Sequence, residues 1–242
     1  MIAAILRLTL RSLLNRRRSV LMLLLAASPV LIALLVRVAG RPVDPVRVEL
    51  NVLDGLIVRT VLPLVALVLG TGAMGSELED GNAVYLLTKP IPRWRITAAK
   101  LLAAGGLTAA LVAPAALVTG FLLAGDQGGG ARIAVAYAAA SIVGSFLYSA
   151  VFLAASVASG RALIIGLVYT LLWEGFLASL FAGSRAFSIR EYTIGLAAIL
   201  DPDRIDAPLN SITSVVGSAA VLAISFVLAT RWLAGFQVRA AE

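Results

Sequence analysis

Residues 16–36 read RRRSVLMLLLAASPVLIALLV. Three arginines come first, and the 18 residues that follow them carry no charge. A helix needs roughly 20 mainly apolar residues to cross the ~30 Å hydrocarbon core of a membrane. Because Lys and Arg favour the cytoplasmic side of such a segment, the stretch predicts a membrane-spanning helix over 19–36 whose N-terminal end lies inside.

The rest of the 242-residue chain has the same character, since 60% of its residues are apolar and only 14% are charged. Soluble domains contain about 45–50% apolar and about 25% charged residues, so an ordinary soluble enzyme is excluded. Disorder is excluded as well, because it requires low hydrophobicity. The sequence predicts an all-α membrane protein with one domain, 1–242, and six transmembrane helices, at 19–36, 56–73, 96–124, 133–159, 162–181 and 212–233.

The basic residues predict the orientation of these spans. With the N-terminus inside, twelve of the 20 Lys and Arg residues fall on inner segments and eight on outer ones. This asymmetry favours a topology with both termini in the cytoplasm. It also explains the net charge of +7, so no nucleic-acid partner is expected. The acids Asp44, Glu49 and Asp54 fall in the outer connection before the second span.

The segment 1–17 has apolar residues at helical spacing, with Arg7 and Arg11 four residues apart. This pattern predicts an amphipathic helix in the cytoplasmic interface. The alternative is that it forms the tilted start of the first span. The anchoring residues of the interface are expected to be Arg7, Arg11, Arg16, Arg17, Arg18 and Trp94.

The segment 74–95 combines acids, prolines and bases. Glu77, Glu79 and Asp80 come first, Pro90 and Pro92 prevent one continuous helix, and Arg93 and Arg95 flank Trp94. We predict a short cytoplasmic helix and a stiff turn that could fit a groove on a soluble partner. The alternative is an ordinary charged loop.

The outer segment 183–211 is predicted to contain a helix, since Ser188 is followed three residues later by Glu191, as in a capping box. Its apolar face is expected to consist of Ile189, Tyr192, Leu196, Ile199 and Leu200. Such a segment would be interfacial or re-entrant. The acid-rich stretch 201–206 after it favours a solvated turn over a cation site, because nothing in it fixes the ligand geometry.

One acid, Glu174, lies inside the predicted fifth span, beside Trp173 and five residues after Tyr169. Carboxylates within a membrane are costly and usually face a bundle interior or a water-filled cavity. Glu174, Tyr169 and Trp173 are therefore candidates for a pathway or gate. The alternative role for Glu174 is a structural pair with a basic residue such as Arg59 or Arg37.

The chain contains no His and no Cys. Zinc, haem and iron–sulfur sites normally need one or both, and histidine-dependent serine or cysteine catalysis is impossible. No catalytic residue, metal or cofactor is therefore expected on this chain.

The segment from Glu77 to Lys100 resembles the family of ABC-2-type transporter permeases. In that family an acidic stretch and a Gly precede an apolar turn, a Pro, an Arg and a Lys. The matching residues here are Glu77, Glu79, Asp80, Gly81, Leu86, Leu87, Pro90, Arg93 and Lys100, while Asn82 stands where the family often has Thr. The stretches LWEG at 172–175 and SIREY at 188–192 resemble the bacterial branch whose ATPase is a separate chain.

The resemblance implies a permease subunit of an exporter in the cell inner (plasma) membrane. ATP and Mg²⁺ would bind a partner ATP-binding cassette ATPase, because this sequence lacks the glycine-rich phosphate loop with Lys-Ser or Lys-Thr. That ATPase would dock on the 76–95 helix, on the motif residues through Lys100 and on residues 2–17. A second permease chain would complete a homodimer or heterodimer. The alternative from the residues is a secondary transporter or channel without an ATPase, and a membrane-embedded enzyme ranks lower.

Overall fold

The computed structural model describes residues 2–14, 16–40, 44–79, 92–124, 130–177 and 182–239. These residues are mostly helical and include no strand. Five helices among them are long and apolar enough to cross a membrane, namely Val20–Ala39, Pro45–Met74, Arg93–Ala124, Gly130–Ala158 and Ser211–Gly235. An all-α, multi-pass membrane architecture, predicted from the sequence, is thus confirmed.

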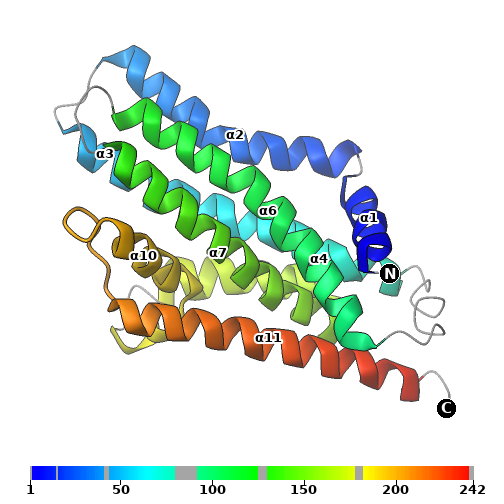
Figure 1. The fold of residues 1–242 in the computed structure, drawn as a ribbon. Helices are drawn as coiled ribbons and strands as arrows, with labels where there is room; N and C mark the ends of the chain where they lie inside the picture. The colour runs from blue at the N-terminus through cyan, green and yellow to red at the C-terminus, as the bar shows by residue number, and fades with distance from the viewer. Residues whose placement is uncertain are drawn as a thin grey trace.

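Figure 1 shows the long helices packed lengthwise in one bundle. In chain order the elements are α1 (Ile2–Leu13), α2 (Arg16–Ala39), α3 (Pro45–Val52), η1 (Leu53–Val61), α4 (Leu62–Glu79), α6 (Arg93–Ala124), α7 (Gly130–Ala158), α8 (Ala162–Val168), η2 (Tyr169–Leu177), η3 (Ala182–Phe187), α10 (Ile189–Leu200) and α11 (Ser211–Arg239). The segments η1 and η2 are wide π-helical stretches, and η3 is a tight 3-10 turn.

Helix α7 forms the centre of the bundle. Its most apolar window is 67% buried, whereas those of α2 and α11 are only 22% buried. Small residues bring its neighbours close: Gly144 of α7 lies against Leu62 and Thr193, and Gly70 of α4 lies against Phe152 of α7. Such contacts let helix backbones approach closely where apolar lipid provides little drive for association. Helices α2 and α11 therefore present most of their apolar surface outward.

The two chain termini lie at the same end of the bundle (Figure 1). This end also holds α1 and the ends of α4 and α6 that flank residues 80–91, and we name it the α1 end. The opposite end, which holds α3 and α10, we name the α10 end. Placing both termini at one end agrees with the predicted topology, while the side of the membrane that this end faces stays a prediction.

The N-terminal segment forms a helix of its own. In α1, Ile5, Thr9 and Leu13 are buried, and the helix packs against α6 and α4. Arg7 and Arg11 are exposed on its other side. The segment is therefore helical and two-faced, as predicted, and its position in the membrane interface stays a prediction.

The helical stretch that contains the predicted second span, 56–73, is longer than that span. The helix begins at Pro45, because Asp44 caps it by accepting a hydrogen bond from the Arg47 backbone N–H at 3.1 Å and proline favours the first helical position. It then continues through Glu49 and Asp54, two acids of the outer connection that is predicted before this span. The helix start at Asp44 and Pro45 is a local pattern, and the helix forms there although charged residues follow it.

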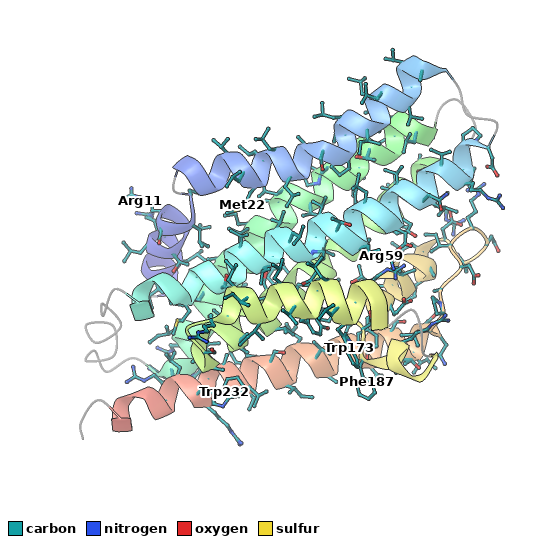
Figure 2. All side chains as sticks on the ribbon, turned by 180° about the vertical axis from the view of Figure 1, so that it is seen from behind. Arg11, Met22, Arg59, Trp173, Phe187 and Trp232 are labelled. Atoms are coloured by element: carbon teal, nitrogen blue, oxygen red, sulfur yellow. The ribbon has the colours of Figure 1, made fainter. Side chains whose placement is uncertain are left out.

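The predicted fifth span, 162–181, is described only as far as residue 177. Its helical part, Ala162–Gly175, is shorter than the five candidate spans, and its second half is the wide helix η2. It nevertheless runs along the bundle toward the α10 end (Figure 2). The count of six spans therefore stays a prediction.

A substitution at Gly120 of α6 tests how closely α6 and α7 pack. A Cβ at this position would overlap the Cβ of Ala134 and lie 2.9 Å from its Cα, whereas a Cβ at Gly106 of the same helix would meet nothing within 4 Å. We expect Gly120→Ala to lower the stability of the detergent-solubilised chain by about 1–3 kcal/mol, the usual cost of overpacking. Thermal unfolding followed by circular dichroism measures this effect.

Gly106→Ala is the matched control, and it should be neutral or stabilising by up to about 1 kcal/mol, because alanine favours a helix over glycine. Equal melting temperatures for the two variants would show that α6 and α7 do not approach as described.

Candidate functional site: a charged chamber at the α10 end

Polar side chains gather around a cavity of about 420 Å³ at the α10 end. Four elements and a turn form its walls: the α3–η1 helix, α7, η3, α10 and the turn after α10. The charged and aromatic residues of the wall include Asp54, Arg59, Tyr137, Arg185, Arg190 and Glu191. We refer to this cavity as the chamber. Helix α10 forms one wall of the chamber, and it packs against α7 and α11.

Helix α10 begins at Ile189 because two side chains cap its N-terminus. Ser188 accepts a hydrogen bond from the Glu191 backbone N–H at 3.4 Å, as the capping pattern predicted. Glu174 Oε1 accepts from the backbone N–H groups of Ile189 at 2.9 Å and Arg190 at 3.4 Å. The first amides of a helix have no partner within it and carry partial positive charge, so a carboxylate there is doubly favourable.

Glu174 receives two further hydrogen bonds from tyrosines. The Tyr148 hydroxyl of α7 donates to Oε2, and the Tyr169 hydroxyl donates to Oε1 at 3.2 Å. The side chain is almost fully buried. Four donors match the acceptor capacity of one carboxylate, so its burial is compensated without a neighbouring cation.

The predicted pairing of Glu174 with Arg59 or Arg37 is wrong. Arg59 Nη2 donates instead to the Gly175 carbonyl at 3.1 Å, and Arg37 Nη1 donates to the Leu122 carbonyl at 3.4 Å. The structure does bring Tyr169 to Glu174, while Trp173 lies in η2 toward the same end of the bundle as Arg59 and Phe187 (Figure 2). A pathway or gate role for the three residues stays a prediction.

An ion pair links α10 to η1 across the chamber. Arg190 Nη2 lies 3.0 Å from Asp54 Oδ2, and Arg190 Nη1 lies 3.6 Å from Glu191 Oε1. Burial raises the pKa of Glu191, and Arg190 opposes that rise. Burial alone would lower the pKa of Arg190, but Asp54 raises it and the net shift is upward. Arg190 therefore stays protonated and is fixed in place.

Glu49 is a buried acid that the sequence analysis missed. Both of its carboxylate oxygens are buried without a hydrogen-bond partner among the described residues. They lie beside α6 and the start of α7, since a Cβ added at Gly120 or Gly130 would come within 3.2 Å and 2.8 Å of them. The pair Asp44-Pro45 is a helix-start pattern, and it could have predicted that Glu49 lies in a helix and not in the outer connection.

The acid-rich turn at 201–206 is less solvated than predicted. Asp201 is buried and lies 3.6 Å from the Arg204 guanidinium. On α10, Ile199 and Leu200 are exposed while Ile194 and Ala197 are buried, and the position of this helix in the outer leaflet stays a prediction. In the described ranges no group of three or more acidic side chains is arranged to hold a metal ion.

Those of the predicted docking residues that the structure describes lie at the α1 end, far from the chamber along the bundle. Glu77 and Glu79 belong to the last turn of α4, and Arg93 to the first turn of α6. Trp94 is 49% exposed, with the Arg95 guanidinium 5.3 Å from its ring centroid, a cation–π contact. Asp80, Gly81, Leu86, Leu87 and Pro90 lie outside the described residues. Arg16, Arg17 and Arg18 form the first turn of α2.

Lys100 departs from the expectation of a surface docking residue. Its side chain is completely buried, and Nζ donates to the Ala73 carbonyl of α4 at 2.5 Å. Lys100 therefore joins α6 to α4 within the bundle, because a buried ammonium must find acceptors. It cannot touch a partner in this conformation.

The cap on α10 can be tested by removing its charge. Glu174→Gln would place an amide N–H₂ among four donors, leaving buried N–H or O–H groups unpaired at about 1–3 kcal/mol each. We expect faster amide hydrogen exchange at Ile189 and Arg190 in the variant. Tyr169→Phe, which removes one donor of four, should have a smaller effect. Unchanged exchange in Glu174→Gln would contradict the capping role.

The sequence was compared with known protein families. A family model described as "ABC-2 family transporter protein" matches residues 14–189, which is more than half of the chain. A search of curated proteins found no significant match. The matched region runs from just before α2 through η2 to the first residue of α10, and includes Glu174 and Lys100. The chain therefore belongs to the ABC-2 family of transporter proteins and is a membrane permease of the ABC transporter class.

Proposed function

We propose that this permease is the membrane-spanning subunit of an ATP-driven exporter, and that a separate ATP-binding cassette ATPase binds ATP and Mg²⁺. The observation that carries the proposal is the family match over residues 14–189. The sequence supports a separate motor, because it lacks a glycine-rich phosphate loop. Two permease chains, identical or different, would share one pathway across the cell inner membrane.

The α1 end is the face that we propose for ATPase docking. It carries the last turn of α4 with Glu77 and Glu79, the exposed Trp94 and Arg95, and the exposed Arg7 and Arg11 of α1. The described side chains of this face include exposed arginines, an aromatic ring and the apolar Leu8, which is 66% exposed. Aromatic residues and arginines are enriched in protein interfaces. The same end would face the cytoplasm.

Lys100 supplies a physical route for the coupling. Its hydrogen bond to Ala73 ties α6 to α4 close to the ends that flank residues 80–91. A force on the docking segment would therefore move both helices together, as a rigid-body motion. Because α7 packs against both, the motion would pass to the centre of the bundle. Glu174, Tyr169 and Trp173 would respond at the far end as pathway or gate residues.

The docking face can be tested by charge reversal and co-purification. We expect the wild-type chain to co-purify with an ATP-binding cassette ATPase from cells that express its genomic neighbours. Glu77→Lys combined with Glu79→Lys should reduce that association about tenfold, because reversed charges at an interface cost at least the corresponding ~1.4 kcal/mol. Partners are identified and quantified by mass spectrometry.

Asp203→Lys combined with Asp206→Lys is the control, since it makes the same change of charge at the α10 end. Equal recovery of the ATPase with the Glu77 and Glu79 variant would remove this face from the interface. Isolation of the wild-type chain without any ATPase would overturn the proposed function in favour of a secondary transporter or channel.

A further inference from the structure

Glu49 of α3 is a fully buried acid whose carboxyl group has no hydrogen-bond partner in the described part of the chain. Its side chain is 0% exposed, and neither carboxylate oxygen receives a hydrogen bond there. Glu174, in contrast, accepts four hydrogen bonds. A buried polar group without a partner is costly, and a buried charge without one costs far more.

Two glycines form the site that holds the carboxyl group. A Cβ added at Gly120 of α6 would lie 3.2 Å from Glu49 Oε1, and one added at Gly130, the first residue of α7, would lie 2.8 Å from Oε2. We name this site, formed by Gly120 and Gly130, the Glu49 socket. The two glycines leave room for the carboxyl group but offer it no side-chain donor.

The charged groups closest to the socket already pair with each other. Helix α3 packs against η1, α6 and α7, and the turn after α10 lies near enough for Asp201 and Arg204 to act on Glu49 electrostatically. These two side chains form an ion pair at 3.6 Å. Tyr137 of α7 also interacts electrostatically with Glu49. The opposite charges of Asp201 and Arg204 largely cancel at the socket.

The other charged groups on the elements around α3 have partners of their own. The charged residues of α6 all lie in its first turns, at the α1 end. On α3, η1 and α7 the pairs are Asp44 with Arg47, Asp54 with Arg190, Arg59 with the Gly175 carbonyl, and Arg132 with the Leu200 carbonyl. Among the described residues, no group forms a hydrogen bond or an ion pair with Glu49.

These surroundings favour the neutral carboxylic acid over the carboxylate. A carboxylate can only accept hydrogen bonds and would be buried in the socket without a donor, whereas the acid carries no charge. Neither oxygen is accessible to solvent. An ionised Glu49 would therefore reach water only if α3 moved away from α6 and α7, so ionisation and this movement are linked.

We propose that Glu49 is a proton-binding site, which holds a proton while α3 is packed against α6 and α7, and that loss of this proton is coupled to release of α3. Leu50 and Asn51, the next two residues of α3, line the chamber. Release of α3 would therefore move one wall of the chamber. The inference goes beyond the proposed function and does not depend on it.

The proposal determines the sign of the pH dependence. The packed state binds one proton that the released state gives up, so a rise in pH favours release. One proton changes the equilibrium between the two states by at most about tenfold per pH unit. At low pH both states keep the proton, and the equilibrium no longer depends on Glu49.

The first measurement asks whether Glu49 carries a proton. Infrared spectroscopy of the purified full-length chain in detergent separates the C=O stretch of a carboxylic acid from the bands of a carboxylate. At about pH 6, exposed carboxyl groups are almost all ionised. We expect a carboxylic-acid band in the wild type that is lost in Glu49→Gln. Asp203→Asn, which removes an exposed acid at the same end, is the control and should keep the band.

The second measurement follows the release of α3 by amide hydrogen exchange between about pH 6 and pH 9, corrected for the intrinsic pH dependence of exchange. In the wild type and in Asp203→Asn, protection of α3 should fall as the pH rises, by up to about tenfold per unit. In Glu49→Gln it should not change with pH, because glutamine has no proton to lose. A purely structural role for Glu49 would shift the protection equally at every pH.

Glu49→Met places an uncharged, flexible side chain in the socket and carries the same prediction if Glu49→Gln does not fold. The wild type alone also decides, because the carboxylic-acid band and the protection of α3 must be lost over the same pH interval. Loss over separate intervals would overturn the proposal.

A wild type without a carboxylic-acid band that the Glu49 variants remove would contradict the proposed proton site. Equal pH slopes of α3 protection in the wild type and in these variants would overturn the coupling to α3. Neither measurement includes an ATPase, so these results are separate from the outcome of the co-purification.

Discussion

The buried carboxylate of Glu174 accepts hydrogen bonds from two tyrosine hydroxyls and two backbone N–H groups, and much of the α10 end depends on this cluster. A carboxylate in a low-dielectric interior is tolerated only when its acceptor sites are filled. The donors come from α7, η2 and the start of α10, so the cluster joins three elements that are distant in the sequence. It fixes where α10 begins and therefore which of its side chains face the chamber.

Close packing at small residues provides the frame that holds this cluster in place. Gly120 of α6, Gly144 of α7 and Gly70 of α4 allow these helices to approach their neighbours at distances that a side chain would prevent. Lipid is as apolar as leucine, so helices in a membrane gain little from burying apolar surface and depend on such contacts. The outer helices α2 and α11 contribute less to this frame, and most of their apolar side chains face outward.

The two ends of the bundle differ in chemistry. At the α10 end, charged groups are drawn inward: Asp54 meets Arg190, Asp201 meets Arg204, and Glu49 is buried between helices. At the α1 end, the side chains of Arg7, Arg11 and Arg95 are exposed. The side chain of Lys100, in contrast, is buried between helices. Exposed arginines and an aromatic ring suit a protein partner, and a recessed cavity with a few polar groups suits a small molecule. This asymmetry underlies the division of roles between the proposed docking face and the chamber.

The sequence by itself determined the helical membrane class, the family resemblance and the Ser188 cap, because apolar run length and capping patterns are local properties. It identified Glu174 as unusual but named arginines as its partners, since a sequence shows charges and not which backbone amides are free. The burial of Glu49 and Lys100 and the assembly of the chamber were decided only by the tertiary structure. Each depends on which helices are neighbours, and that arrangement follows from side-chain packing between segments far apart in the chain.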